Sequence, residues 1–254
     1  MPTRPHTDEL TKFNLGRVWS FWKTNGFGAL MRHGRFVILK RLHFSMWDRR
    51  FEHLEKIATR GFVATHDLAP SGALHLQQAN EYAPSPRLVV HWLLNSLNTD
   101  LSRSSFVDYG SGRGRVLLTA AEKPFDAVRG VEFSKQLHEE AAINIANYPA
   151  DHLACRDIQS VYGDALEFDP PRGDCVLYFY NPFDANLLSR VVRQALDVIV
   201  SRGDRATLIY ANPVHGQVMA DEPRLMERKL SLLLRFKLRF LSPCDARIFE
   251  LIGD

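Results

Sequence analysis

The chain has 254 residues, of which 45% are hydrophobic and 24% are charged, a composition that excludes bulk disorder and suits one sizeable α/β domain. The net charge is only +3, but residues 1–60 carry twelve Lys/Arg against five Asp/Glu, so a basic N-terminal stretch precedes a mildly acidic remainder. MPTRPHTDEL has no apolar h-region, and no apolar run reaches the ~18 residues that a membrane span needs, so we expect a cytoplasmic protein without a secretory signal or a transmembrane segment.

Residues 1–81 are predicted to form a helical extension that is rich in basic and aromatic residues, ahead of a main domain over 82–254. The glycines at 26, 28 and 34 interrupt its apolar pattern, so one continuous helix is not expected. Three alternatives remain open for this arm: it binds a nucleic acid, it lies on an anionic membrane surface, or it packs its aromatic side chains on the core.

From residue 82 onward the pattern alternates between turn, helix and strand signals. YAPSP (82–86) predicts a turn, and the final segments 229–241 and 246–252 are predicted to pair as antiparallel strands. Strands alternating with helices predict an α/β fold with a doubly wound, mostly parallel sheet. The elements expected between those ends are helix 87–98, strand 106–110, helix 112–123, strand 127–133, helix 134–148 capped by Ser134, a strand and turn over 158–165, strand 174–183, helix 185–203 closed by Gly203, and strand 206–213.

Cysteine and metal chemistry find no support in the pattern. The cysteines have no C-x-x-C spacing and are odd in number, which argues against both a disulfide framework and a zinc site. We expect no metal, and we expect reduced, structural thiols at Cys155, Cys175 and Cys244.

FVDYGSGRGRVLLTAA (106–121) places three glycines between a predicted strand and a predicted helix. Glycine permits a tight turn and close approach, and the backbone N–H groups at a helix start favour a nucleotide-like ligand. The dinucleotide fingerprint G-x-G-x-x-G would place its third glycine at position 115, which is Arg115. The spacing here is G-x-G-x-G instead.

That spacing, preceded by Val107 and Asp108, resembles motif I of the class I (Rossmann-like) S-adenosylmethionine-dependent methyltransferases. GVEF (130–133), VYGDA (161–165) and YNPFD (180–184) follow in the order of that family's later motifs. The resemblance covers roughly residues 82–252. It implies a Rossmann-like fold, S-adenosyl-L-methionine as cofactor and methyl transfer as the activity.

The resemblance assigns cofactor roles to individual side chains. It implies that Glu132 accepts the ribose hydroxyls, that Asp164 binds the adenine amino group and that Asp108 lies near the methionine end. The alternatives are that Asp108 caps the following turn, that Glu132 is a surface acid and that Asp164 forms a turn. Arg113 and Arg115 are expected to be ordinary surface residues. The full expected binding set is Tyr82, Ser85, Asp108, Gly110, Ser111, Gly112, Gly114, Glu132, Phe133, Gly163, Asp164, Ala165 and Asn181.

A narrower resemblance is to a bacterial group of these methyltransferases with mostly undefined substrates, through WDRRF (47–51), YAPSP, RDIQSVYGDA (156–165) and LYFYNPFD (177–184). The stretch 52–61 departs from that group and receives no predicted role. The arrangement is also similar to non-SET protein lysine methyltransferases, in which a turn comparable to YAPSP closes over the cofactor. That similarity favours a protein lysine amine as acceptor, although an ordinary helix-initiating turn ending at Pro86 is the alternative.

The candidate catalytic residues are Tyr180, Asn181, Pro182 and Phe183. They resemble in part the [DN]-P-P-[FYW] motif of nucleic-acid amino-methyltransferases, where the Asn accepts a hydrogen bond from the target amino group and the aromatic ring stacks on the base. The second proline is missing, and ANPVH (211–215) repeats Asn-Pro, so a strand-ending turn is the alternative. His215 is predicted to be a rim residue, or otherwise a general base. N6-adenine-type methylation and a catalytically silent cofactor-binding module remain competing functions.

Overall fold

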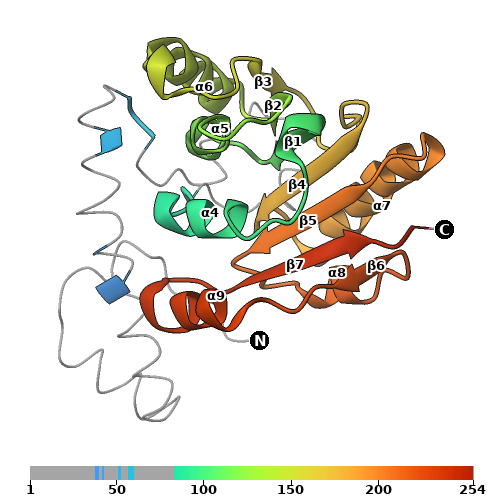
Figure 1. Cartoon of the computed structure of the whole chain (residues 1–254). Helices are drawn as coiled ribbons and strands as arrows, with labels where there is room; N and C mark the ends of the chain where they lie inside the picture. Colours follow the sequence, from blue (N-terminus) through green and yellow to red (C-terminus); the bar gives the residue numbers. More distant parts are fainter. Residues whose placement is uncertain (1–37, 40–41, 43–50, 53–56, 60–82, 254) are drawn as a thin grey trace, which may run out of the picture.

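The computed structural model describes residues 38–39, 42, 51–52, 57–59 and 83–253. Most of the predicted N-terminal extension and the candidate binder Tyr82 therefore lie outside the described residues (Figure 1). No helix among the described residues is long and apolar enough to cross a membrane.

One seven-stranded sheet in the order β3-β2-β1-β4-β5-β7-β6 forms the centre of the domain (Figure 1). The first five strands in this order are parallel, whereas β7 runs antiparallel to both β5 and β6. This confirms the predicted doubly wound, mostly parallel sheet with an antiparallel end. The strands are β1 Ser104–Tyr109, β2 Ala127–Glu132, β3 Ile158–Tyr162, β4 Asp174–Tyr180, β5 Ala206–Ala211, β6 Leu225–Glu227 and β7 Ala246–Leu251.

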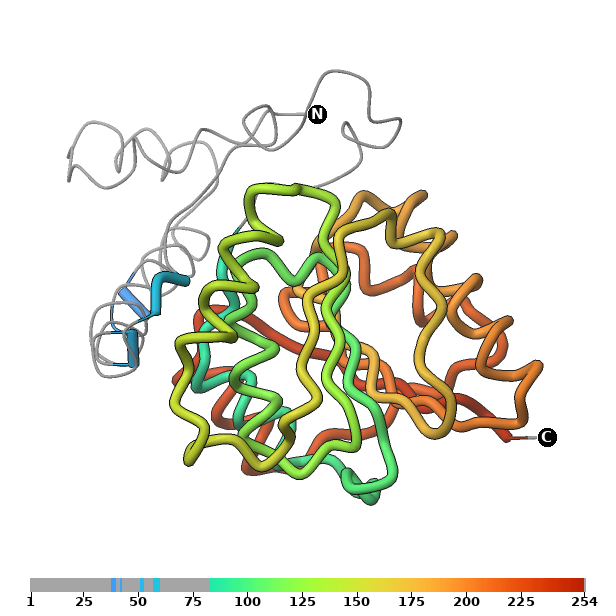
Figure 2. Tube along the Cα trace, turned by 90° about the horizontal axis from the view of Figure 1, so that it is seen from above, coloured from blue at the N-terminus to red at the C-terminus, as the bar shows by residue number. Residues whose placement is uncertain are grey.

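Helices cover both faces of the sheet, and Figure 2 shows α5 and α6 (green to yellow-green) on the opposite side of the strands from α7 (orange). Successive strand residues alternate between the two cores: Phe106 of β1 packs with α4 and α5, whereas Val107 packs with α7. Because both faces are covered, the central strands β4 (DCVLYFY) and β5 (ATLIYA) are nearly continuous apolar runs. The helices are α4 Arg87–Leu94, α5 Arg115–Ala121, α6 Lys135–Asn147, α7 Ala185–Ser201, α8 Gln217–Ala220 and α9 Leu232–Phe236, followed by the π-helix η7 Lys237–Leu241.

The structure confirms the residues that were predicted to begin helix α6 and to close helix α7. Ser134 caps α6, with its Oγ accepting a hydrogen bond from the backbone N–H of Leu137 at 3.4 Å. Gly203 takes a φ of +72° two residues beyond the end of α7. The three cysteines are buried and free, in agreement with the prediction of reduced structural thiols.

The prediction of a strand over 229–241 is wrong, because this segment forms α9 and η7, and the strand that pairs with β7 at the edge is β6. Most of its apolar residues occur at every second position, as on one face of a strand. The same pattern also places apolar residues four positions apart, as on one face of a helix. Ser231 caps the helix by accepting from the N–H of Leu234, and Leu234 and Leu238 are then buried four residues apart. The intervening row, Leu232, Phe236 and Phe240, consequently faces outward.

Gly130 of β2 allows the glycine-rich loop to lie directly on the sheet. A Cβ added there would lie 2.5 Å from Ser111 Cβ and 2.8 Å from Leu117 Cδ1. We expect Gly130→Ala to lower the free energy of unfolding by about 2 kcal/mol, within the usual cost of overpacking a core. Urea unfolding followed by circular dichroism measures this change.

Gly163→Ala is the matched control, because a Cβ at Gly163 meets nothing within 4 Å. Its unfolding free energy should stay close to that of the wild type. Equal stability of the two variants would contradict the close packing of the loop on β2.

Candidate functional site

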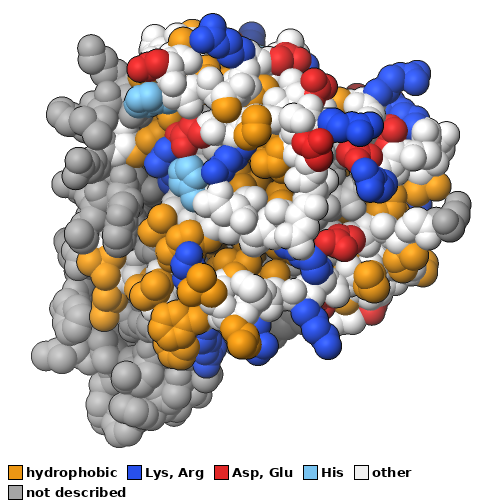
Figure 3. Space-filling view, viewed as in Figure 1, with side chains coloured by type: hydrophobic (Ala, Val, Ile, Leu, Met, Phe, Trp, Pro, Cys, Tyr) orange, Lys and Arg blue, Asp and Glu red, His pale blue; other side chains and the backbone are white. Residues whose placement is uncertain are grey.

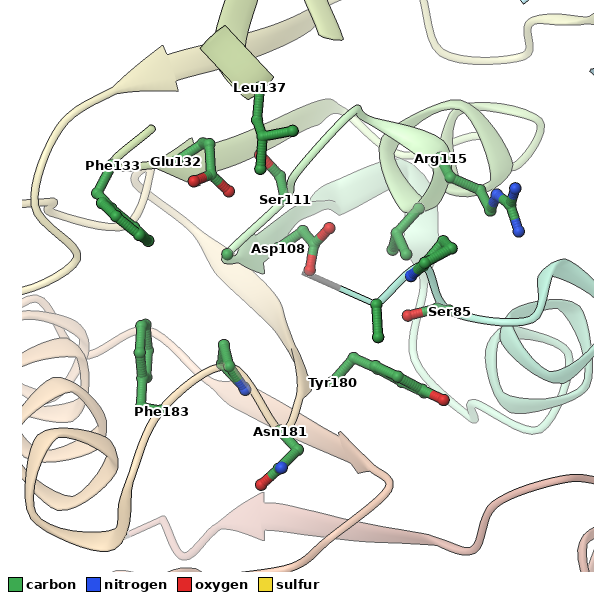
Figure 4. A pocket seen from close by; sticks show the side chains of 15 residues that line it. Ser85, Asp108, Ser111, Arg115, Glu132, Phe133, Leu137, Tyr180, Asn181 and Phe183 are labelled. Carbon is green, nitrogen blue, oxygen red and sulfur yellow. The ribbon is translucent and has the colours of Figure 1, made fainter. Parts of the chain in front are cut away.

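The sheet order reverses between β1 and β4, and a pocket lies beyond the C-terminal ends of these two strands (Figure 4). Ligands of open α/β sheets bind at this position, because the loops leaving neighbouring strands diverge there. The loops after β1, β2 and β4 line the pocket together with the segment before α4. The predicted site residues that it brings together are Ser85, Asp108, Gly110, Ser111, Glu132, Phe133, Tyr180, Asn181, Pro182 and Phe183.

The other described members of the predicted binding set are not among the residues that line this pocket. Gly112 and Gly114 belong to the same loop as Gly110, with φ values of +52° and +79°. Gly163, Asp164 and Ala165 follow β3, and Asp164 Oδ1 accepts a hydrogen bond from the N–H of Leu166 at 2.9 Å. Asp164 thus stabilises the local turn, as its alternative interpretation expected, and its predicted contact with adenine stays a prediction.

The carboxylate of Glu132 connects two loops of the site. Its Oε2 accepts the N–H of Gly112 at 2.8 Å, and its Oε1 accepts the N–H of Ser134 at 2.9 Å. Only 3% of the residue is exposed. Burial raises the pKa of Glu132 to about 7, although the backbone N–H groups oppose this rise by stabilising the charged form.

Asp108, the fifth residue of β1, is a second buried acid in the pocket. Burial raises its pKa well above the ordinary value, and the nearby charge of Glu132 raises it further. Among the described residues that line the pocket, the one arginine is Arg115, and it points away from both acids in Figure 4. The pocket therefore favours a ligand that brings positive charge or hydrogen-bond donors.

Two features of the glycine-rich loop also point toward a ligand. Ser111 Oγ is buried and has no hydrogen-bond partner among the described residues, which is costly unless a ligand supplies one. Gly110 has a φ of +80°, and a Cβ there would lie 2.9 Å from Pro182 Cβ. Only glycine lets the loop after β1 approach the turn after β4 so closely, which leaves the loop backbone facing the pocket.

The turn after β4 has the same backbone form as the turn after β5. Asn181 and Asn212 have φ values of +47° and +51°, and each precedes a proline. The hydroxyl of Tyr210 donates to Asn181 Oδ1 at 3.0 Å and accepts the N–H of His215 at 3.2 Å. The repeated Asn-Pro is thus a strand-ending turn, and at β4 this turn also lines the pocket.

Aromatic side chains lie on both sides of the pocket's left half in Figure 4. Phe133 projects from the end of β2 and Phe183 from the turn after β4, toward the same space. Asn181 points away from Asp108, toward β5. A flat apolar group can therefore enter between the rings, while polar groups meet the acids.

The expectation that Arg115 is a surface residue is wrong, because only 2% of it is exposed. Its Nε donates to Thr59 Oγ at 2.8 Å, and its Nη2 pairs with Glu52 Oε1 at 3.0 Å. Glu52 and Thr59 are themselves buried. Arg113 pairs with Glu140 and is partly exposed.

Asn144 of α6 connects Ala58, next to Thr59, with Arg113 of the glycine-rich loop through hydrogen bonds. Its Oδ1 accepts the N–H of Ala58 at 2.9 Å, and its Nδ2 donates to the carbonyl oxygens of Ala58 and Arg113 at 3.1 and 3.0 Å. No local pattern in 52–61 predicts these contacts, because Thr59 and Glu52 lie 56 and 63 residues before Arg115 in the sequence.

No protein-family model and no curated protein matches this sequence. Among solved structures, the chain is similar to an RNA methyltransferase from Salinibacter ruber in complex with S-adenosyl-L-homocysteine, with 16% identity, 68% of this chain and 95% of that chain covered, and a TM-score of 0.44.

Two further similar structures come from Bacillus cereus and Synechocystis. The first is an O-methyltransferase in complex with SAH, with 14% identity, coverage of 67% of this chain and 83% of that chain, and a TM-score of 0.46. The second is magnesium protoporphyrin IX methyltransferase with bound SAH, with 16% identity, coverage of 66% and 81%, and a TM-score of 0.42. The fold of this chain is defined by its own strand order and pairing.

The buried cluster of Glu52, Thr59 and Arg115 predicts a large effect of removing one charge. We expect Glu52→Ala to lower the free energy of unfolding by about 3 kcal/mol, because Arg115 would lose its buried counter-charge. Adding Arg115→Met to that variant should restore most of the loss. Urea unfolding of both variants measures this.

Glu139→Ala is the control, since Glu139 pairs with Lys135 at 3.8 Å and both side chains are more than half exposed. Its effect should stay within about 1 kcal/mol. A loss equally small for Glu52→Ala would show that the cluster contributes little to stability.

Proposed function

We propose that this chain is an S-adenosyl-L-methionine-dependent methyltransferase. The observation that carries the proposal is the pair of buried acids, Asp108 and Glu132, at the point where the strand order reverses. Both acids have a raised pKa, so a ligand that brings positive charge and hydroxyl donors would stabilise their ionised forms. S-Adenosylmethionine has a sulfonium, an ammonium and a ribose diol. The partnerless hydroxyl of Ser111 adds a polar group for the same ligand.

The residues around the acids suit the parts of that ligand. Glu132 would accept the ribose hydroxyls with the lone pairs that Gly112 and Ser134 do not use. The adenine ring would lie beside Phe133, with Asp164 at its amino group, as the family resemblance implies. The methionine end would then lie toward Asp108 and Ser85.

The bound cofactor would supply a methyl group on a positively charged sulfur. The chain's own contribution is to position an acceptor nitrogen in line with that methyl and to exclude water. The acceptor amine must be neutral to attack, and its proton leaves after transfer. Tyr180, Asn181, Pro182 and Phe183 would form the entrance through which the amine arrives.

We propose a protein lysine amine as the acceptor, following the resemblance to non-SET lysine methyltransferases. In the nucleic-acid enzymes the matching Asn oxygen binds the target amino group, whereas Asn181 Oδ1 here already accepts from Tyr210. A slender lysine side chain needs less room than a flipped base, which supports the amine on a flexible chain. Nucleic-acid amino methylation remains the competing acceptor, and a silent cofactor-binding module remains the competing class.

Glu132→Gln tests the cofactor site through binding alone. Calorimetric titration with S-adenosylmethionine and S-adenosylhomocysteine should show affinity in the wild type that rises as the pH rises through about 7, because Glu132 then ionises. The variant should bind about tenfold more weakly above that pH, the cost of one charge-assisted hydrogen bond, and should lose the pH dependence near 7.

Glu139→Gln, on the exposed face of α6, is the control and should bind like the wild type. An unchanged dissociation constant in Glu132→Gln would refute the ribose assignment. Absence of binding in the wild type at every pH would refute the proposed function itself.

Asn181→Ala and Asn212→Ala form a matched pair for testing turnover, because both asparagines have the same backbone form but only Asn181 lines the pocket. Lysate proteins incubated with a labelled methyl donor and the enzyme should acquire label that protease, and not nuclease, removes. Asn181→Ala should lower this labelling at least tenfold, because the turn at the entrance would lose its bond from Tyr210 and alanine adopts a φ of +47° poorly, and it should change cofactor affinity less than twofold.

Asn212→Ala should retain most of the labelling. If both variants label lysate proteins equally, the turn at Asn181 has a structural role only. Nuclease-sensitive label would replace the lysine acceptor with a nucleic acid, and absence of label despite cofactor binding would favour the silent module.

A further inference from the structure

An unusually apolar surface lies on α9 and η7, and we call it the α9–η7 face. Leu232 is 81% exposed and Leu233 64%, while Phe236 and Phe240 are 54% and 55% exposed. Leu241, at 47%, extends the surface. Figure 3 shows orange side chains gathered at the lower left of the coloured surface, in the region where Figure 1 places α9. A contiguous exposed apolar patch on a folded domain marks an interaction surface.

This exposure follows from the helical packing of the segment. Leu234 and Leu238 are 4% and 3% exposed and fix the inner side of the helix in the core of α4 and α5. Residues two positions away lie about 200° around a helix, so Leu232 and Phe236 must face outward. The apolar face is thus a rigid feature of the domain.

Positive charge surrounds the apolar side chains. Lys229, Arg235, Lys237 and Arg239 lie within the segment, and the sequence has no acid between Glu227 and Asp245. Among the described residues, no acid forms an ion pair with Arg235 or Arg239, and both side chains are exposed. Blue side chains accompany the orange ones in Figure 3. The face therefore combines leucine and phenylalanine with cations, the composition of segments that lie at a membrane surface.

The α9–η7 face lies at the edge of the sheet where the pocket opens. A hollow of about 1020 Å³ beside it is lined by Phe236 and Phe240, and also by Pro213 in the loop after β5 and Ala246 at the start of β7. The C-terminal end of β5 and the N-terminal end of antiparallel β7 share this edge with the ends of β1 and β4. A flat partner that covers the face would therefore lie near the entrance of the site.

We propose that the α9–η7 face binds an anionic membrane surface, with its leucines and phenylalanines inserted and its cations against lipid phosphates. Charge selects this occupant. Like charge disfavours two other occupants, the stretch 1–60 with its net charge of +7 and a second basic face of the same kind. A nucleic acid would match the charge, but exposed Leu232 and Leu233 cannot stack on bases as aromatic side chains do. The proposal does not depend on methyl transfer.

A fluorescent label at Leu233→Cys in the full chain tests the face directly. The three native cysteines are buried, so a thiol-directed nitrobenzoxadiazole label will react at the new, exposed position. Vesicles of phosphatidylcholine mixed with phosphatidylglycerol should shift the emission to the blue, and vesicles of phosphatidylcholine alone should not. The same label at Ile143→Cys on α6, which is 60% exposed, is the control and should not respond.

Co-sedimentation with the same vesicles separates the face from the basic N-terminal stretch. Leu232→Ser/Phe236→Ser keeps every charge and should weaken partitioning about tenfold through lost apolar burial. Ile143→Ser should partition like the wild type. Partitioning unchanged in the double variant, with no spectral shift at Leu233→Cys, would overturn the proposal and leave binding to the N-terminal stretch.

The emission of the same label also reports on other occupants of the face. A shift at Leu233→Cys with an oligonucleotide and not with anionic vesicles would replace the membrane with a nucleic acid. A shift that depends on protein concentration alone would indicate self-association. Either result would overturn the proposal.

Discussion

The carboxylate of Glu132 is the interaction on which the rest of the site depends. It accepts the N–H of Gly112 from the loop after β1 and the N–H of Ser134 from the start of α6, so one side chain sets the relative position of two loops. This geometry requires the loop to lie on β2, which the missing side chain of Gly130 permits. The cost is a buried acid with a pKa near 7, which a suitable ligand would lower.

A second constraint reaches the same loop from a distant part of the chain. Glu52 and Thr59 bind Arg115 at the first turn of α5, while Asn144 binds both Ala58 and the carbonyl of Arg113. Buried charges gain stability only when they are paired in good geometry, so this cluster ties the positions of Glu52, Ala58 and Thr59 to that of the glycine-rich loop. The position of the glycine-rich loop therefore depends on residues from distant parts of the chain as well as on its own sequence.

Most of the fold and much of the pocket could be predicted because their signals are local. The alternating strands, the Ser134 cap and the loop around Gly110 each depend on a few neighbouring residues, and the strand order then brings Asp108, Glu132 and Asn181 to one pocket. Arg115 could not be placed correctly, since its exposure is decided by partners 56 and 63 residues away. The hydrogen bond from Tyr210 to Asn181 joins β5 to the turn after β4, and no local pattern in either segment predicts it.

The segment 229–241 shows how one pattern can specify two structures. Its alternating apolar residues would all have faced one side of a strand, whereas the helix sends Leu234 and Leu238 inward and Leu232 and Phe236 outward. The edge of the sheet is already completed by β6, so a strand here would have had no place beside β7. The helix therefore buries only about half of these alternating apolar side chains in the core. The other half stays in water unless another surface covers it, and the cations among them determine that this surface should be anionic.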